Sequence, residues 1–255
     1  MAYINSYKAP HGPTLLPGYY GPDPYDINWT MPLHEATLES ERVKLTPFIP
    51  SLHAKEYAEQ TAARPELHRW FPFDPSGLDT ILTLVELRVR RDPTWILFAI
   101  IDKARGGGGA FAGVIGLINA SPENLSAEIA WVLVFPAFQR TYVTTNAVGL
   151  LLRYCLELPD APQGRGLGFR RVQWTTHTKN EASLKAAKRM GFREEGLHRW
   201  TWVLPEGFEG NGIAVRSGDP ERGRPGRNSV VLSLCGDDWE QRGRSQVEGL
   251  INHVQ

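Results

Sequence analysis

The chain has 255 residues, and its 28 Lys and Arg side chains balance 28 Asp and Glu, which gives no general attraction to nucleic acid or an anionic membrane. Its content of 42% hydrophobic and 22% charged residues is that of a globular protein, and its length suffices for one substantial core. No run approaches the roughly 18–20 apolar residues of a membrane helix, and the start lacks the pattern of a signal peptide. Cys155 and Cys235 show no metal or redox spacing, so we expect a cytoplasmic protein, with the nucleus as the alternative.

The first 36 residues are dense in Pro, Gly and Tyr and show neither a helical nor a strand period. Disorder is one interpretation of such a composition. The alternative is an arm that packs on the following domain, which the aromatic residues Tyr19, Tyr20, Tyr25 and Trp29 favour.

Residues 37–240 read as one domain, because apolar residues recur there at strand or helix spacing. In chain order they predict a strand over 37–48, helices over 51–64 and 76–89, strands over 95–101, 111–119 and 127–134, a helix ending at 158, a strand over 170–176, a helix over 181–190, and strands over 192–204 and 229–235. This alternation predicts an α/β (α+β) fold, a mixed central sheet of about seven strands flanked by helices. The Gly- and Arg-rich stretch 205–228 is expected to be a mobile loop, and 241–255 a C-terminal tail.

The most informative stretch is the predicted strand 127–134 and the helix after it. Pro136 ends the strand, because proline has no N–H for a ladder, and Thr141, Thr144 or Thr145 can cap the helix. The unpaired N–H groups at a helix N-terminus bind phosphate readily. The stretch therefore predicts a phosphate site between the strand and the helix.

Three segments carry a resemblance to a known family: AEIAWVL at 127–133, N-E-A-S at 180–183 followed by KRMGF and EG up to 196, and SVVLSLCGDDWE at 229–240. In this order and spacing, residues from about 38 to 240 resemble the GCN5-related N-acetyltransferase (GNAT) superfamily, in the branch of ribosomal-protein N-terminal acetyltransferases. The resemblance implies acetyl-CoA as co-substrate and a small-molecule amine or a protein N-terminus as acceptor. We expect a monomer or homodimer without nucleic-acid or membrane partners and, because no metal-ligand spacing is present, without a metal.

The resemblance also implies which residues contact the cofactor. The strand at 132–134 would separate from its neighbour and pair with the pantetheine amides, and the loop at 139–144 would bind the pyrophosphate. The implied residues are Val132, Leu133, Val134, Gln139, Arg140, Thr141, Tyr142, Val143, Thr144, Asn180, Ser183 and Arg189. Tyr142 stands where the family loop, Q/R-x-x-G-x-G/A, has glycine. Either its ring fills the phosphate notch, or the ring points away and the N–H still donates.

A base is needed for the acceptor, because an ammonium group cannot attack a thioester. Glu128 is the first candidate, and the alternative is a buried carboxylate satisfied by the backbone or a tyrosine. His177 is the second candidate, against an ordinary loop histidine. Ser183 is the candidate acid for the departing thiolate, and it also fits a structural role that completes the helix cap of Asn180.

Four aromatic residues are candidates for substrate binding: Trp70, Phe71, Trp131 and Trp200. Core packing is the alternative for each. Together they favour an apolar or aromatic acceptor over a polyamine.

The sequence thus favours an acyl-CoA-dependent N-acetyltransferase in which the amine attacks the thioester directly, in a ternary complex. Tyr142 motivates two alternatives. One is an enzyme on the same scaffold with CoA-independent chemistry on a small apolar molecule. The other, supported also by the aromatic arm, is a non-catalytic binding module.

Overall fold

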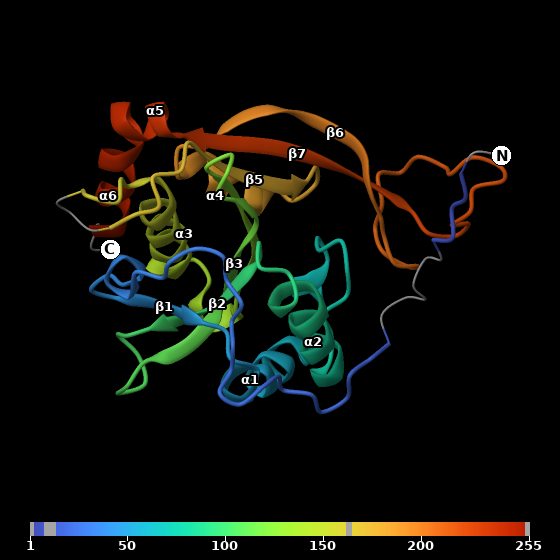
Figure 1. The fold of residues 1–255 in the computed structure, drawn as a ribbon, viewed down its shortest axis with the longest axis horizontal. Coiled ribbons are helices and arrows are strands. Elements are labelled where there is room, and N and C mark those ends of the chain that lie inside the picture. The colour runs from blue at the N-terminus through green and yellow to red at the C-terminus, as the bar shows by residue number, and fades with distance from the viewer. Residues whose placement is uncertain (1–2, 8–13, 162–164, 253–255) are drawn as a thin grey trace.

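One mixed sheet of seven strands forms the centre of the molecule, in the order β1-β2-β3-β4-β5-β7-β6 (Figure 1). The structure, a computed structural model, describes residues 3–7, 14–161 and 165–252. The strands are β1 (Val43–Pro47), β2 (Ile96–Asp102), β3 (Ala110–Ser121), β4 (Ser126–Val134), β5 (Arg171–His177), β6 (Arg193–Val203) and β7 (Gly226–Cys235). Every neighbouring pair is antiparallel except β4 and β5, which are parallel. The predicted mixed α/β sheet is therefore confirmed.

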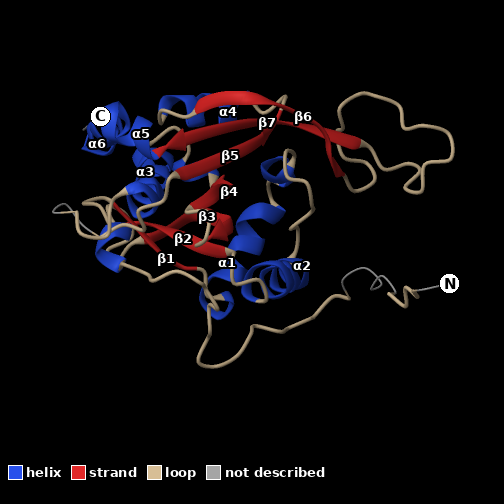
Figure 2. Ribbon diagram, turned by 45° about the horizontal axis from the view of Figure 1, so that its top comes forward, coloured by secondary structure: helices blue, strands red, loops and turns tan. Residues whose placement is uncertain are grey.

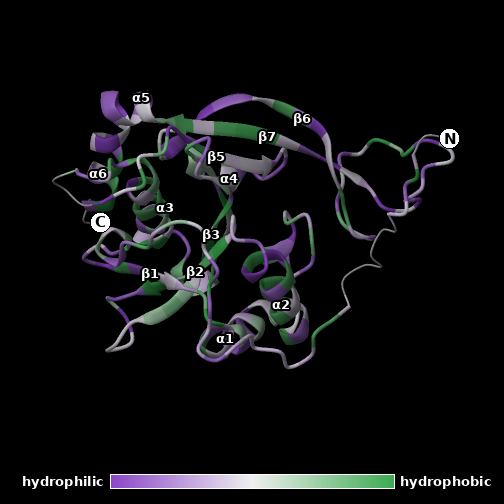
Figure 3. Cartoon of the chain, viewed as in Figure 1, coloured by the Kyte–Doolittle hydropathy of each residue, from purple (hydrophilic) through white to green (hydrophobic). Residues whose placement is uncertain are grey.

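Helices cover both faces of the sheet (Figures 1 and 2). They are α1 (Pro50–Ala62), α2 (Leu78–Leu84), α3 (Tyr142–Leu156), α4 (Glu181–Arg189), α5 (Gly236–Asp238) and α6 (Arg244–Asn252), with short 3-10 or π turns between them. The apolar residues of α1 and α2 form one core cluster with the sheet, and those of α3, α4 and α6 form another. Figure 3 shows the hydrophobic character of β7, which lies in the sheet between β5 and the exposed edge strand β6. No helix in the described ranges has the length and hydropathy needed to cross a membrane.

The sheet opens in its middle, between β4 and β5. The two strands pair only from Ser126 opposite Arg171 to Ile129 opposite Trp174. Beyond Ile129, β4 continues along β3 alone, with Val134 opposite Gly113. One edge of β4 thus carries main-chain groups without a strand partner, at the residues where the family resemblance implies that the strand separates from its neighbour.

A bulge at Trp131 changes the alternation along β4. Its neighbour β3 advances two residues while β4 advances three, from Ala130 to Leu133, and Trp131 has φ +52°. As a result, Ile129 packs on the α3 side, whereas Trp131 and Leu133 pack on the α1 and α2 side. The strand predicted over 127–134 is therefore present but is interrupted by a bulge at this point. The bulge brings Glu128 and Trp131 onto one face.

Residues 14–36 of the N-terminal arm contact the domain. The backbone N–H of Leu16 donates to Thr83 Oγ1 (2.8 Å), and the indole of Trp29 donates to the hydroxyl of Tyr154 (3.1 Å). Further bonds reach the carbonyl of Arg90 in the π turn after α2 and that of Pro93 before β2. These contacts favour the packed-arm interpretation. Residues 1–2 and 8–13 of the arm lie outside the described residues.

The C-terminal segment contains a helix that the sequence analysis did not predict. In α6, Val247 and Ile251 are buried against α3, where a Cβ at Gly149 would lie 2.6 Å from Ile251 Cδ1. Gly149 is therefore required for the close approach of α3 and α6. The apolar positions Val247, Leu250 and Ile251, three and four residues apart, are the sequence signal for this helix.

Candidate active site

A cavity of about 510 Å³ lies where β4 and β5 separate. Side chains from the central strands, from the N-termini of α3 and α4, from the segment before α2 and from β7 surround it. The lining residues are Trp70, Phe71, Pro72, Phe73, Trp95, Ile118, Glu128, Ile129, Ala130, Trp131, Val132, Val134, Gln139, Arg140, Thr141, Thr144, Thr145, Val148, Trp174, Thr175, Thr176, Asn180, Ala182, Ser183, Ala186, Arg189, Met190, Trp202 and Arg227. Most of the residues predicted from the sequence are thus brought together.

The loop before α3 presents free backbone donors to this cavity. Thr141 is the N-cap of α3, and its hydroxyl accepts from the N–H of Val143 (3.3 Å), as predicted. The N–H groups of Arg140, Thr141 and Tyr142 have no acceptor within the described part of the chain. Arg140 adopts φ +58°, a conformation that non-glycine residues seldom take outside tight functional turns. Unpaired donors and the helix dipole together make this end of α3 suitable for an anion.

The ring of Tyr142 points away from this loop. Its hydroxyl donates to Asp102 Oδ1 (2.8 Å) at the end of β2, and the guanidinium of Arg42 lies 4.4 Å from the ring centre. Burial and the bond to Asp102 raise the pKa of this phenol. Of the two alternatives for Tyr142, the structure therefore shows the second, in which the ring points away and leaves the loop before α3 open.

Three of the residues implied for the cofactor turn their side chains away from the cavity. Val143, in the first turn of α3, is fully buried in the core. Leu133 packs in the core on the α1 and α2 side, and Tyr142 contacts Asp102. Their side chains are not among those that line the cavity. These positions can contribute only through their main-chain groups.

The N-terminus of α4 closes another side of the cavity. Asn180 Oδ1 accepts from the N–H of Ser183 (3.1 Å), which confirms the predicted cap. The indole N–H of Trp174 donates to Ser183 Oγ (2.9 Å). Because this oxygen already accepts a hydrogen bond, its own proton is free to point to another acceptor. The structural and chemical roles considered for Ser183 are compatible.

Glu128 lies on the cavity side of β4 with a side-chain partner. Gln173 Nε2, on the neighbouring strand β5, donates to Glu128 Oε2 (2.9 Å). Burial raises the pKa of Glu128, while hydrogen bonds from Thr175 and Gln173 and the charge of Arg227 oppose the shift. A carboxylate with a raised pKa is closer to the range in which a general base is effective near neutral pH.

Arg227 is a lining residue that the sequence analysis missed. It is only 5% exposed, its Nη1 donates to the carbonyl of Trp70 (3.0 Å), and its Nε has no partner among the described residues. Burial lowers the pKa of Arg227 to about 10, against the opposing charge of Glu128. The sequence placed this arginine in a solvated loop, but β7 begins at Gly226 and carries it into the cavity.

His177 lies beside the cavity and is not among its lining residues. It is buried at the end of β5, its ring centre is 4.7 Å from that of Trp70, and its Nδ1 accepts from the N–H of Lys179 (3.0 Å). Burial and, after it, the charge of Arg227 lower the pKa of His177 to about 4. This environment favours a neutral ring that supports Trp70.

Of the four candidates for substrate binding, Trp70, Phe71 and Trp131 line the cavity, whereas Trp200 does not. Trp200 has φ +53°, is 41% exposed, and packs its ring on Gly226. It sits where the register of β6 shifts against β7, and Trp202 reaches the cavity instead.

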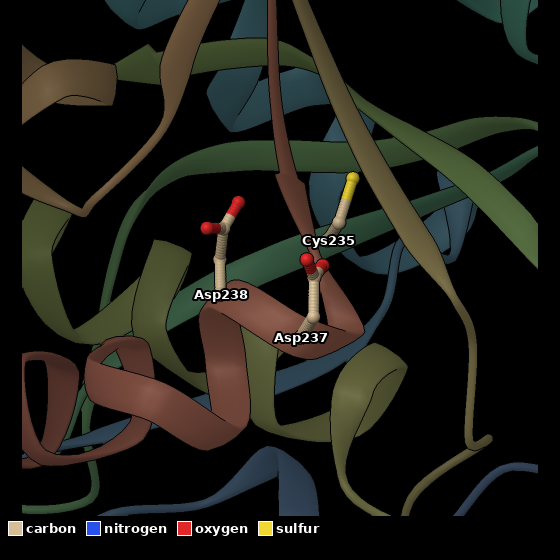
Figure 4. Close-up of side chains that lie close together, drawn as sticks. All are labelled: Cys235, Asp237 and Asp238. Atoms are coloured by element: carbon tan, nitrogen blue, oxygen red, sulfur yellow. The ribbon is translucent and has the colours of Figure 1, made fainter.

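The described residues contain one group with metal-ligand side chains, formed by Cys235, Asp237 and Asp238 within 4.8 Å of one another (Figure 4). It lies at the junction of β7 and α5, and its members do not line the cavity. Asp238 already pairs with Arg193 (2.5 Å), which neutralises part of the negative charge that a cation would require.

Comparison with known proteins gives two further findings. Residues 42–193 match the family model described as an acetyltransferase (GNAT) domain. No match was found among curated protein sequences.

Several solved structures are similar to the chain. A probable acetyltransferase (GNAT family) from Chromobacterium violaceum is 25% identical over 92% of this chain and 100% of that one, with a TM-score of 0.65. A GCN5-related N-acetyltransferase from Brucella melitensis is 24% identical over 84% of each chain, also at 0.65. RimJ from Mycobacterium smegmatis, in complex with CoA-disulfide, is 17% identical over 81% and 88% of the two chains, at 0.59.

Proposed function

The chain belongs to the GNAT acetyltransferase family, and from that premise we propose that it transfers the acetyl group of acetyl-CoA to an amine by direct attack in a ternary complex. One observation carries the proposal. The unpaired edge of β4 and the free N–H groups before α3 border the same cavity. The pantetheine arm of acetyl-CoA is extended and carries amides, which suit the unpaired edge of β4. The pyrophosphate joined to this arm suits the free N–H groups before α3.

The cofactor would lie along β4 and across the start of α3. Its pyrophosphate would accept from the N–H groups of Arg140, Thr141 and Tyr142, and its pantetheine amides would pair with the free edge at Val132. Arg189, in the last turn of α4, would add positive charge. The open position of Tyr142 removes the reason for a CoA-independent reaction, since the ring does not occupy the loop.

The reaction would take place while the amine and acetyl-CoA are bound together in the cavity. The amine nitrogen attacks the thioester carbon, a C–N bond forms, and Glu128 accepts the proton that the nitrogen loses. The C–S bond then breaks, and CoA leaves as a thiolate that takes its proton from Ser183 Oγ, which regains it from water. Trp174 holds that oxygen in place through its indole N–H. Amide and free CoA are the products, and no covalent enzyme intermediate forms.

Isothermal titration calorimetry with acetyl-CoA, followed by an assay for free thiol with a panel of amines, tests this proposal. We expect saturable one-site binding and thiol release that depends on the amine. Absence of binding at millimolar acetyl-CoA would contradict the proposed function. Binding without release of thiol from any amine would favour a non-catalytic module instead.

A further inference from the structure

Resting on the proposed acetyltransferase function, we propose that the acceptor is an amine that also carries a carboxylate, namely an amino acid with a large apolar side chain, and that Arg227 binds this carboxylate. The proposal concerns the part of the cavity bordered by β7, Glu128 and the segment before α2. It rests on one incompletely satisfied cation, one carboxylate that lines the same cavity, and the aromatic rings beside them.

Arg227 has hydrogen-bonding capacity that the described chain does not use. Its side chain is 5% exposed, yet its Nε has no partner, and no acidic oxygen of the described residues lies within 4.0 Å of its guanidinium. The single bond from Nη1 to the carbonyl of Trp70 satisfies only one of its five N–H groups. Buried charges are normally paired, so a buried arginine on a cavity without an anion is suited to an anion from outside.

Glu128 supplies the opposite charge at the same cavity. Glu128 lies on β4 opposite Gln173 of β5, which pairs with Ser233 of β7, so Arg227 stands farther along β7 and its long side chain reaches the cavity from another level of the sheet. The charge of each group opposes the pKa shift that burial causes in the other. Two opposite charges that line one cavity suit a molecule that carries both an ammonium and a carboxylate group, as an α-amino acid does.

The surroundings of the two charges are apolar and aromatic. The ring of Phe73 lies 4.9 Å from Trp131 in an edge-to-face contact, and Phe71 lies 6.2 Å from it. Trp70, whose carbonyl binds Arg227, and Trp202, opposite Arg227 in the β6–β7 register, add two more rings. Such rings favour an apolar side chain, whereas Arg227 would repel the additional ammonium groups of a polyamine.

The test compares acceptors that differ only in the carboxylate. The full chain and acetyl-CoA are assayed with phenylalanine, tryptophan and leucine, with the primary amides of these amino acids, and with phenethylamine, tryptamine and isoamylamine, which lack the carboxylate. A charge-assisted pair to one carboxylate predicts that kcat/KM is about 10- to 100-fold higher for at least one amino acid than for its amide and amine. This comparison uses only the wild-type protein, so its result does not depend on whether a variant folds.

Variants then assign the preference to Arg227. Arg227→Met should raise KM for the amino acid more than for the matched amine, so that the ratio of their kcat/KM values falls to about 1, and Arg227→Lys should restore part of that ratio. Arg64→Met, at an exposed arginine in the turn before the 3-10 helix η2 (Pro65–His68), is the control and should change neither.

The outcomes separate this inference from the proposed function. Equal activity on amino acids, amides and amines, turnover of amines alone, or an equal loss on all acceptors in Arg227→Met would contradict the inference and leave the transferase intact. Acetyl-CoA binding without turnover of any amino acid would contradict it as well. Absence of acetyl-CoA binding would contradict the proposed function itself.

Discussion

The two ends of the cavity are built in different ways. The proposed cofactor end uses mainly backbone groups, from the free edge of β4 and the loop before α3, which follow each other closely in the chain. The proposed acceptor end uses side chains that arrive from distant segments, such as Trp70, Glu128 and Arg227. A site formed by main-chain groups tolerates a change of side chain: Tyr142 stands where the family has glycine, and its N–H, which has no acceptor among the described residues, is still free to donate. A site formed by side chains changes its specificity when any of those residues changes.

The largest expected effect is at the acceptor end. Glu128→Gln should lower kcat by about 100- to 10,000-fold, because the amide cannot accept the proton, and should leave acetyl-CoA affinity unchanged. In the wild type, kcat/KM should fall as the pH is lowered through the pKa of Glu128, which burial raises above the 4.5 of an ordinary glutamate. Steady-state kinetics against pH and calorimetry measure both quantities.

The exposed carboxylate Glu123, in the turn before β4, supplies the control. Glu123→Gln should retain the wild-type rate and pH profile. A wild-type rate in Glu128→Gln would show that water or another group takes the proton.

The backbone character of the cofactor end is tested at Tyr142, the first residue of α3. Tyr142→Pro removes one N–H and suits the N1 position, since Thr141 before it is extended. Tyr142→Ala loses the same ring and keeps the N–H. Calorimetry should show acetyl-CoA affinity about 10-fold weaker in the proline variant and close to wild type in the alanine variant. Equal affinities would mean that this N–H does not contact the cofactor.

Ser183 lies where the two ends meet, and a smaller effect is expected there. Ser183→Ala keeps the N–H that Asn180 caps and removes only the hydroxyl that accepts from Trp174. We expect kcat to fall by a factor of about 3 to 10, because water can replace the proton donor, and thermal stability to fall slightly, because the indole N–H of Trp174 loses its acceptor. An unaltered kcat at all pH values would limit Ser183 to its role in the cap.

The last effect concerns stability rather than activity. His177 has a pKa of about 4 when folded and 6.5 as an ordinary histidine, so between these values the unfolded chain binds a proton that the folded protein does not. The free energy of unfolding should therefore decrease by about 3 kcal/mol as the pH falls from 6.5 to 4. In His177→Asn, denaturant titrations should show a weaker decrease, since no imidazole remains to titrate. His198→Asn, at an exposed site on β6, should leave the dependence in place.

Much of the fold could be predicted from the sequence, because apolar periodicity and helix caps are local. The order of strands and helices follows from it, and the caps Thr141 and Asn180 were recognisable by residue type and position. The bulge at Trp131 was not, because apolar and small residues continue through it without interruption and only the pairing with β3 reveals it.

The acceptor end could be predicted least. Arg227 resembles the charged loop that precedes it, and only the start of β7 places it in the cavity. Trp200 and Trp202 are both tryptophans on β6, so the sequence does not distinguish them. The irregular register of β6 decides which one lines the cavity. His177 follows a buried strand like many catalytic residues, yet the packing of Trp70 covers it. In each case a contact between distant segments decides the position.

The binding mode proposed for acetyl-CoA can be checked in a crystal structure of the complex. We expect the pyrophosphate at the N–H groups of Arg140, Thr141 and Tyr142, and the pantetheine arm along the free edge of β4, with the acetyl carbon between Glu128 and Ser183. A cofactor bound elsewhere, or β4 and β5 closed against each other with those N–H groups paired within the protein, would contradict it.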